Sequence, residues 1–418
     1  MRVMAIMHRA QNHVCEGVIC GCRRYDRCST SLRICSTWWK FQLCLVQGIC
    51  GFLAAGVRGL MGAIKNIQVV GVIFLLVWLL SAVSFTRDQR LSEDIEVLAD
   101  HFQYWISYIW KSKPAKSTII VAKNGTADFI HIQQAVDSVP DWHKRRTVIL
   151  ICSGIYREKV FIPKEKEKIT LLGEGNGTVI EWNNTASDHG PNGLPLKTYH
   201  SATVEVDAEF FVAKNIIFKN AARPPELGQQ GRQAVALRVS ADKAAFYNCT
   251  FLGHQDTLYD HKGRHYFKNC SVKGSIDFIF GNGRSLYQEC NIIASTEGHI
   301  GILTAQRRNI KTMDTGFSFV GCIISGSGKN YLGRAWGRNS RVVFSHTWMD
   351  DIIVPKGWDD WGSPDGREKS VFYAQYKCFG PGANTSLRVS WSRELSPEEA
   401  LPFLTVNFIE GREWLEEI

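Results

Sequence analysis

The stretch AFYNCTFLG (245–253) recurs in altered form as HYFKNCSVKG (265–274), SLYQECNIIA (285–294) and FSFVGCIISG (317–326). Each copy has an aromatic or apolar pair, a polar residue, a cysteine and then alternating apolar positions. The cysteines are separated by 21, 20 and 32 residues. One short strand per copy and a period of roughly 20 residues are typical of a solenoid, and they predict a parallel β-helix.

The same pattern extends beyond these four copies. FVAKNIIFKN (211–220) precedes them and VVFSHTWMDD (342–351) follows them. Short β-rich segments dominate this region, and helical character is confined to FIHIQQAVDSVP (129–140) and SPEEALPFL (396–404). We therefore expect residues 115–418 to form one all-β domain, a parallel β-helix with short helical caps.

The repeated cysteines are expected to form a ladder inside the solenoid. Equivalent residues of successive coils stack roughly 4.8 Å apart, so Cys249, Cys270, Cys290 and Cys322 would lie one above another. Buried thiols are good small apolar fillers. Disulfides between neighbouring coils remain an alternative in a secreted protein. No histidine or acidic residue shares the spacing, so the ladder does not predict a metal site.

Two aspartates occupy unusual apolar surroundings in GHQDTLY (253–259) and GSIDFIFGN (274–282). Asp256 and Asp277 each lie seven residues after one of the ladder cysteines, so they should stack on neighbouring coils. Two carboxylates at that separation titrate as a coupled pair, and one is driven to keep its proton near neutral pH. A single aspartate in a turn is usually structural, whereas this pair suggests a nucleophile beside an acid.

The neighbours of the pair favour acyl transfer. Paired carboxylates would also suit a retaining glycosidase. However, Gln255 precedes Asp256 directly, and Gln233 of GRQAVALRV lies about one coil earlier. An uncharged amide can stabilise a developing oxyanion without protonating it, although an isolated buried glutamine is more often structural. In YLGRAWG, Arg334 could keep one carboxylate ionised and Trp336 could stack against a sugar.

Other catalytic motifs are missing from the sequence. It contains neither H-E-x-x-H nor G-x-S-x-G, and GEGNG (173–177) lacks the glycine spacing of a dinucleotide site and predicts a turn between strands. We therefore expect no metal, no cofactor and no serine nucleophile.

The charge of the chain is concentrated near its amino end. Residues 1–84 contain nine Lys or Arg against Glu16 and Asp26, and so carry +7 of the formal net charge of +9. The rest of the chain is close to neutral, which gives little support to a nucleic-acid partner.

The amino-terminal region resembles a targeting segment. Residues 68–85, QVVGVIFLLVWLLSAVSF, are uncharged and suit the apolar part of a secretory signal that begins at Met61. We expect an upstream extension of doubtful status at residues 1–60, a signal peptide or signal anchor at 61–84 and a lead-in segment at 85–114. Secretion is the favoured outcome of this segment, and anchoring in a membrane by residues 68–85 is the alternative.

Six sequons are compatible with secretion. N-x-S/T occurs at Asn124, Asn176, Asn183, Asn248, Asn269 and Asn384. We expect Asn248 and Asn269 to lie inside strands and therefore to be unused.

Six motifs together resemble the plant pectinesterases, also called pectin methylesterases, over residues 117–415. The matching blocks are GIYREKV (154–160), KTYHSATV (197–204), QAVALRV (233–239), GHQDTLY (253–259), DFIFG (277–281) and YLGRAWG (331–337). The resemblance implies a right-handed parallel β-helix. It also implies an enzyme that removes methyl esters from homogalacturonan in the cell wall, releasing methanol and leaving free carboxylates.

The resemblance also implies residue roles. Asp277 corresponds to the nucleophile, Asp256 to the proton donor and later base, and Gln255 to the stabiliser of the transition state. The positions that match substrate-binding residues are Thr198, Gln233, Arg334 and Trp336. The aromatic residues that fall where the family lines its groove are Tyr199, Tyr259, Phe280 and Trp358.

Two departures from the family pattern and two rival functions accompany this resemblance. Ala335 stands where many members have proline, and the chain resembles the class without a helical inhibitor-like pro-region.

A pectin lyase or polygalacturonase would share the β-helix, and a non-catalytic wall-binding protein could share the scaffold. The expected partners are pectin and, as a further candidate, a proteinaceous pectinesterase inhibitor. The expected state is a monomer that does not bind nucleic acid.

Overall fold

The computed structural model describes residues 117–224, 228–362 and 366–417. The segments expected at 1–60, 61–84 and 85–114 lie outside these residues. Within the described part, no helix is both long and apolar enough to cross a membrane.

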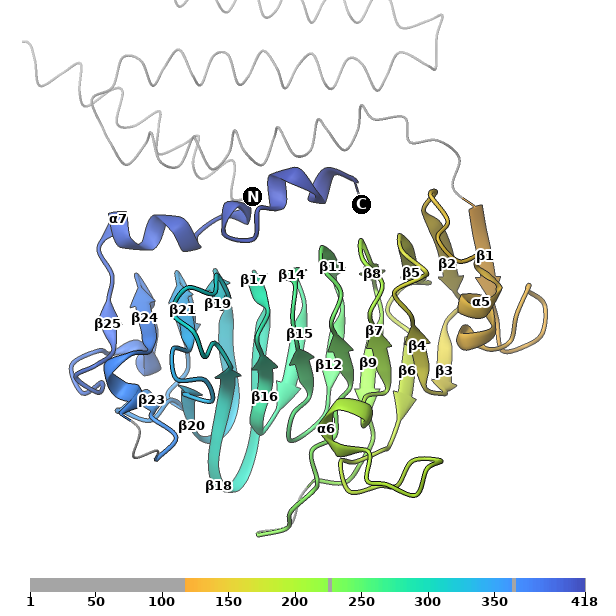
Figure 1. Cartoon of the computed structure of the whole chain (residues 1–418). Helices are drawn as coiled ribbons and strands as arrows, with labels where there is room; N and C mark the ends of the chain where they lie inside the picture. Colours follow the sequence, from red (N-terminus) through yellow and green to blue (C-terminus); the bar gives the residue numbers. More distant parts are fainter. Residues whose placement is uncertain (1–116, 225–227, 363–365, 418) are drawn as a thin grey trace, which may run out of the picture. The chain divides into compact units, whose positions relative to one another are not determined.

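The described chain is a coil of short parallel strands (Figure 1). One sheet follows every coil in order. It comprises β1 (Ser117–Val121), β2 (Thr147–Ile151), β5 (Ile169–Gly173), β8 (Val212–Lys214), β11 (Ala244–Tyr247), β14 (Arg264–Lys268), β17 (Arg284–Gln288), β19 (Gly316–Val320), β21 (Arg341–Ser345), β24 (Phe372–Tyr376) and β25 (Arg393–Glu394). This stack of parallel strands confirms the expected solenoid.

The second sheet consists of two rows of strands that meet through β18 (Asn291–Gln306) and β20 (Ile323–Arg334). The first row comprises β3 (Gly154–Arg157), β6 (Thr178–Trp182), β9 (Ile217–Asn220), β12 (Thr250–Leu252), β15 (Ser271–Gly274) and β22 (Trp348–Met349). The second row, called here the site row, comprises β4 (Val160–Ile162), β7 (Val204–Val206), β10 (Leu237–Val239), β13 (Leu258–Asp260), β16 (Ile276–Gly281) and β23 (Trp358–Asp359). The carboxyl-terminal halves of β18 and β20 continue the site row between β16 and β23.

The helices among the described residues are short, as expected for residues 115–418. They are α5 (Ile132–Ser138), α6 (Lys197–His200), α7 (Pro397–Ala400), and the 3₁₀ segments η1 (Arg367–Lys369), η2 (Pro381–Ala383), η3 (Leu401–Phe403), η4 (Val406–Ile409), η5 (Gly411–Glu413) and η6 (Leu415–Glu417). Ser396 and Glu399 form a capping box that starts α7. The segment from α7 to η6 lies across the first sheet (Figure 1), where Glu410 pairs with Arg264 and Arg284.

Two ladders fill the interior of the coil. Phe246, Phe267, Tyr287, Phe319 and Phe344 stack in succession, with ring centroids 4.5 to 4.8 Å apart. The second ladder is that of the repeated cysteines, which are fully buried thiols and form no disulfide. Because the residue after each of them pairs with its equivalent on the next coil, the predicted cysteine stack is confirmed.

The expectation that the sequons at Asn248 and Asn269 lie inside strands is wrong. Asn248 and Asn269 do not lie inside strands, because each occupies an exposed turn between two strands of its coil. Both have left-handed backbones, with φ of 53° and 54°. Asparagine tolerates this conformation better than most residues, so it suits a sharp corner of the coil.

Candidate active site

Asp256 and Asp277 occupy equivalent places on neighbouring coils. Strands β13 and β16 pair with Leu258 opposite Ile279, so the aspartates two residues earlier face each other in register. The backbone amide of Asp256 also donates to the carbonyl of Ile276 at 3.0 Å. Their exposed fractions are only 8% and 6%. The structure therefore brings together the two carboxyls that the cysteine spacing predicted.

The backbone at both aspartates is strained. Asp256 and Asp277 have positive φ angles, 63° and 49°, in a region that side-chain-bearing residues rarely occupy. Pairing between β16 and β18 also shifts by one residue between Ile276 and Ile279, an irregularity in the stretch that contains Asp277. Bulges beside active sites re-aim a side chain. The strand alternation that would otherwise fix the direction of Asp277 is thus interrupted at this residue.

Arg334 pairs with one member of the aspartate pair. It lies at the end of β20, and its guanidinium donates from Nε to Oδ1 of Asp277 at 2.8 Å and from a terminal nitrogen to Oδ2. The other face of the guanidinium rests 3.8 Å from the ring centroid of Trp361. This two-point contact holds the carboxylate of Asp277 in a fixed orientation.

The two carboxyls differ in acidity. Burial raises the pKa of Asp256 well above its usual value, and the charge of Asp277 raises it further, with only a weak opposing effect of Arg334. Burial also raises the pKa of Asp277, but the hydrogen bonds and charge of Arg334 counteract that effect. Asp277 is therefore the first to lose its proton, and Asp256 remains protonated beside it.

Two glutamines flank the pair with unused amide groups. The backbone amide of Ala234 donates to the carbonyl of Gln255 at 3.1 Å, which places Gln233 one coil before Gln255, as expected. Both side chains are partly exposed, and neither amide group hydrogen-bonds to another described residue. They are free to donate to a ligand.

Thr198 lies on α6 beside a wall of aromatic rings. Its carbonyl accepts from Ser201, while its hydroxyl has no hydrogen-bond partner among the described residues. The next residue, Tyr199, meets Tyr259 edge to face at 6.3 Å. The expected substrate-binding residue is thus placed next to the site row.

Aromatic rings form a cluster along the site row. Tyr259 and Phe280 stack with centroids 4.3 Å apart, and Trp336 follows at 6.0 Å from Phe280. Tyr199 and Trp361 pack against the same cluster. Tyr199, Tyr259 and Phe280, which the sequence resemblance assigned to the groove lining, thus lie in one cluster with Trp336, which it assigned to substrate binding.

Trp358 does not belong to this wall, so its assignment to the groove is wrong. It is 1% exposed and stacks on Tyr373 inside the coil at 4.5 Å. The ring that reaches the site is Trp361, which the sequence interpretation missed. Trp361 has a positive φ of 72°, and its amide is held by the carboxylate of Asp359 at 2.8 Å. The only signal in the sequence was the presence of Trp358 and Trp361, three residues apart. That spacing does not predict which of the two side chains points out of the coil.

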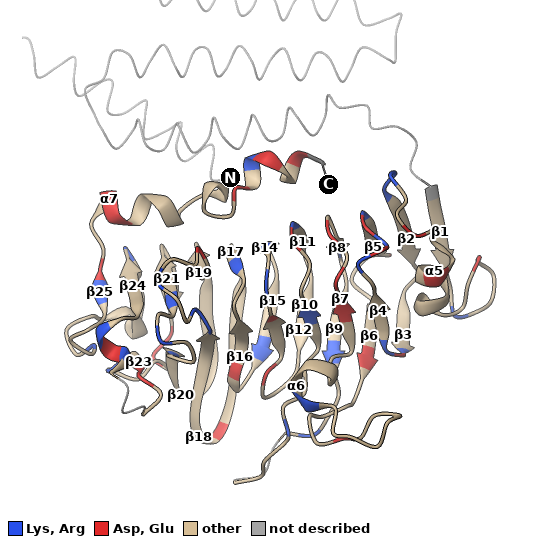
Figure 2. Ribbon diagram, viewed as in Figure 1, with Lys and Arg blue, Asp and Glu red and all other residues tan. Residues whose placement is uncertain are grey.

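A buried arginine, Arg238, packs against Tyr199 of the aromatic cluster. Arg238 on β10 pairs with Glu205 on β7 at 2.6 Å and with Asp207 at 2.8 Å. Figure 2 shows the basic position on β10 beside the acidic position on β7. The guanidinium of Arg238 also lies 3.9 Å from the ring centroid of Tyr199 and donates to the hydroxyl of Tyr199. These contacts fix Tyr199 against the site row.

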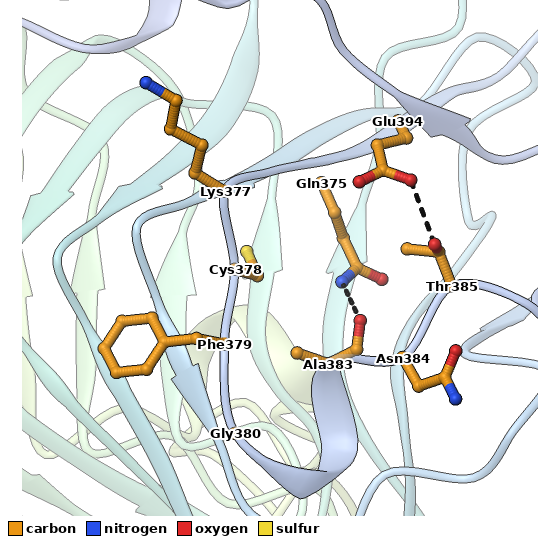
Figure 3. Close-up of a pocket in the computed structure, with 9 residues that line it drawn as sticks. All are labelled: Gln375, Lys377, Cys378, Phe379, Gly380, Ala383, Asn384, Thr385 and Glu394. Atoms are coloured by element: carbon orange, nitrogen blue, oxygen red, sulfur yellow. Dashed lines mark hydrogen bonds between the residues drawn. The ribbon is translucent and has the colours of Figure 1, made fainter.

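A separate cavity of about 310 Å³ at the carboxyl-terminal end of the coil has a different character (Figure 3). Its one carboxylate, Glu394, accepts from Thr385 at 3.0 Å, and Gln375 donates to the carbonyl of Ala383. It contains no carboxyl pair, and its lining includes neither Asp256 nor Asp277. Across the described residues, no group of three or more His, Cys, Asp or Glu side chains is arranged to hold a metal ion.

A family model for pectinesterases matches residues 118–412. The chain belongs to the pectinesterase family. Among curated relatives from Arabidopsis thaliana, pectinesterase QRT1 is 49% identical over 303 residues, covering 72% of this chain and 79% of the relative. Probable pectinesterase 8 is 47% identical over 308 residues, covering 72% and 77%.

Solved structures of pectinesterases share the fold. The pectin methylesterase from carrot is 35% identical, with a TM-score of 0.67 over 73% of this chain and 97% of its own. A pectin methylesterase solved in complex with a hexasaccharide is 26% identical, with a TM-score of 0.62 over 71% and 98%. These neighbours are right-handed parallel β-helices, so the predicted fold class is confirmed. This pectinesterase is a carboxylic ester hydrolase, which agrees with the activity expected from its motifs.

Proposed function

We propose that this chain hydrolyses the methyl esters of homogalacturonan through Asp277 as nucleophile and Asp256 as general acid and base. The observation that carries the proposal is the asymmetry of the pair. Arg334 contacts Asp277, whose pKa it holds down against burial, while burial and the neighbouring charge keep Asp256 protonated. The pair thus offers an ionised carboxylate and a proton donor side by side over the pH range in which only Asp277 has lost its proton.

In the first half of the reaction, the carboxylate oxygen of Asp277 attacks the carbonyl carbon of the methyl ester. The carbonyl oxygen becomes an oxyanion, to which the free amide of Gln255 can donate. The tetrahedral intermediate then collapses, the bond to the methoxy oxygen breaks and Asp256 gives its proton to that oxygen. Methanol leaves, and an anhydride joins Asp277 to the galacturonate carbonyl.

In the second half, Asp256 is ionised and acts as a base. It takes a proton from a water molecule, whose oxygen attacks the galacturonate carbonyl of the anhydride. The bond to Asp277 breaks, which restores its carboxylate and releases a free galacturonate. Asp256 is protonated again, so both carboxyls return to their starting states.

The remaining residues of the site bind the sugar chain. Gln233 and Thr198 carry hydrogen-bonding groups that are unused within the described chain, and Trp336 offers part of an aromatic wall. Arg334 has a double role in this proposal, because it orients Asp277 and borders the groove. Aromatic faces suit the apolar faces of sugar rings, while the amide and hydroxyl groups suit their hydroxyls.

The products of the reaction test the proposal. Purified protein incubated with highly methyl-esterified homogalacturonan should release methanol and acid in equal amounts. The number of reducing ends should stay constant, and no unsaturated ends should absorb in the ultraviolet. New reducing ends would indicate a polygalacturonase and unsaturated ends a lyase. Binding without any product would indicate a non-catalytic wall protein.

We further propose that the protein is secreted to the cell wall as a monomer after cleavage near Phe85. The basis is the uncharged run at residues 68–85, which follows Met61 and Lys65. Peptide sequencing of the protein from a wall extract should find a mature end close to Phe85 and no peptide from residues 1–60. Recovery only from membranes would favour the anchor. Sedimentation, with and without an added proteinaceous pectinesterase inhibitor, would test the monomer and the inhibitor as a partner.

A further inference from the structure

Arg334, Arg238 and Arg307 lie along the site row, and the first two are neutralised by carboxylates. Arg334 pairs with Asp277, and Arg238 pairs with Glu205 and Asp207. Arg307, just beyond the end of β18, is exposed and forms no ion pair with any described carboxylate. It is therefore an uncompensated positive charge beside the candidate active site.

Arg307 belongs to an outer row of side chains beside the aromatic wall. Strand pairing aligns Tyr259 with Phe280, and Phe280 with Ala305, so the residues two places further along each coil also align. These are His261, Asn282 and Arg307, and the next coil adds Trp336. The backbone amide of Arg307 donates to the carbonyl of Gly281 at 2.7 Å, which fixes it one coil beyond Asp277.

Trp336 holds the guanidinium of Arg307 in place. The guanidinium carbon lies 4.6 Å from the centroid of the indole ring, in a cation–π contact. Such a contact restrains the side chain but uses none of its N–H donors. Two of these donors can bind the two oxygens of one carboxylate. Arg307 is thus positioned for an anion that the described chain does not supply.

A neutral histidine lies in the same row. Burial and the charge of Arg238 lower the pKa of His261 to about 4. The hydroxyl of Ser240 accepts from Arg238 and so directs its own hydrogen to Nδ1 of His261, 2.8 Å away. The proton of the ring is then on Nε2, which is a donor without a partner among the described residues. At His261 and Arg307 the outer row therefore presents hydrogen-bond donors, and neither residue is paired with a carboxylate.

We propose that Arg307 binds the carboxylate of an already demethylated galacturonate unit, close to the unit whose ester is being cleaved. This inference rests on the proposed function. A methyl ester is neutral and gains little from an arginine, whereas a free uronate is the anionic group of a pectin chain. One coil, roughly 4.8 Å, separates Arg307 from the level of Asp277, so the recognised unit lies next to the reacting one or one further along. Arg307 thereby makes partly demethylated chains better substrates.

The experiment compares Arg307→Gln with the wild type on two hexagalacturonates, one fully methyl-esterified and one partly demethylated. On the partly demethylated substrate, kcat/KM should fall about tenfold, mainly through KM, as expected for losing a charged hydrogen bond. On the fully esterified substrate kcat/KM should fall clearly less, because that substrate loses only the packing of Arg307 on Trp336. Arg307→Lys should recover part of the loss, and added salt should reduce the preference of the wild type.

The matched control is Arg393→Gln. Arg393 is also exposed and also rests on an aromatic ring, 5.0 Å from the centroid of Phe372, but it lies on β25 in the first sheet. It should affect neither substrate. Circular dichroism should show that all three variants retain the fold.

A binding measurement separates this inference from the proposed function. Calorimetry with a fully demethylated hexagalacturonate requires no turnover, and Arg307→Gln should bind it about tenfold more weakly than the wild type. Equal affinities, or equal losses of activity on both substrates, would overturn the role of Arg307. Failure of the wild type to release methanol from either substrate would instead overturn the proposed function, while the calorimetric comparison would still decide on Arg307.

Discussion

Arg334 contacts Asp277 at two points and leaves Asp256 without a cation of its own. The two aspartates are otherwise nearly equivalent, since they stack on adjacent coils, are buried alike and have left-handed backbones. The single guanidinium therefore breaks the symmetry of the pair. It favours ionisation of one carboxyl and leaves the proton on the other.

Replacing each aspartate by asparagine should separate their roles. Asp277→Asn replaces the attacking carboxylate by a neutral amide and should abolish methanol release from a folded protein. Asp256→Asn removes the acid and should lower the rate by on the order of 10²–10⁴. Methanol assays and circular dichroism on both variants provide the measurement. Equal residual activity in the two would contradict the assignment and favour direct attack by water.

Gln255→Ala should slow the reaction without altering either carboxyl. Loss of one oxyanion donor lowers kcat by roughly 10²–10³. Because the amide makes no hydrogen bond to another described residue, the melting temperature should change little. A large drop in melting temperature with kcat intact would show that this glutamine is only structural.

The pH profile should depend on Arg334. Activity requires Asp277 ionised and Asp256 protonated, so kcat/KM should rise with pH as the first ionises and fall as the second does. Arg334→Gln removes the contact that opposes the raised pKa of Asp277. The rising limb should then move to higher pH and the active range should narrow. An unshifted rising limb, whatever the change in rate, would show that this limb does not report Asp277.

Cys290→Ser should destabilise the coil and leave the chemistry intact. Cys290 is buried in the ladder between Cys270 and Cys322, and its thiol makes weak sulfur contacts, at 3.4 and 3.5 Å, to backbone carbonyls. A buried, poorly paired hydroxyl should lower the free energy of unfolding by about 1–3 kcal/mol. Denaturant titration measures the loss. A large fall in turnover of fully folded protein would instead connect this coil to catalysis.

A buried ion pair should make stability depend on pH. His265 faces acceptors at both ring nitrogens, the carboxylate of Asp260 at 2.6 Å and the carbonyl of Ala241 at 2.8 Å, so the ring is doubly protonated. Burial lowers its pKa, but the charge and hydrogen bond of Asp260, the hydrogen bond to Ala241 and the charge of Asp242 together raise it overall. The stabilisation of the fold by the His265–Asp260 pair is complete below the pKa of histidine in the unfolded chain, about 6.5. It is lost as the pH rises through the higher pKa of His265 in the folded protein.

His265→Gln tests this dependence. The wild type should lose unfolding free energy between neutral and alkaline pH, and the variant should lose less over the same range. Denaturant titrations at several pH values give both curves. Parallel curves would mean that the pair does not control the pH dependence.

The sequence identified the coil and its chemistry because both recur at a fixed period. The cysteines marked equivalent positions on successive coils, and counting seven residues onward from two of them placed Asp256 and Asp277 together. Both results follow from the regular rise of a solenoid, in which equal spacing along the chain becomes adjacency in space. Gln255 and Gln233 were placed in the same way, by their positions relative to Asp256 and its coil, whereas Arg334 was found through the motif YLGRAWG.

The tertiary structure alone decided what depends on irregular backbone or on contacts between distant segments. The irregular pairing near Asp277 and its left-handed backbone, the choice of Arg334 for one aspartate, and the inward turn of Trp358 against the outward turn of Trp361 follow no period. The unpaired charge of Arg307 also follows no period. It is found only when the ion-pair partners of the neighbouring carboxylates are known. A repeat fixes which coil a residue occupies, but the direction of its side chain is set by local φ angles and by what packs against it.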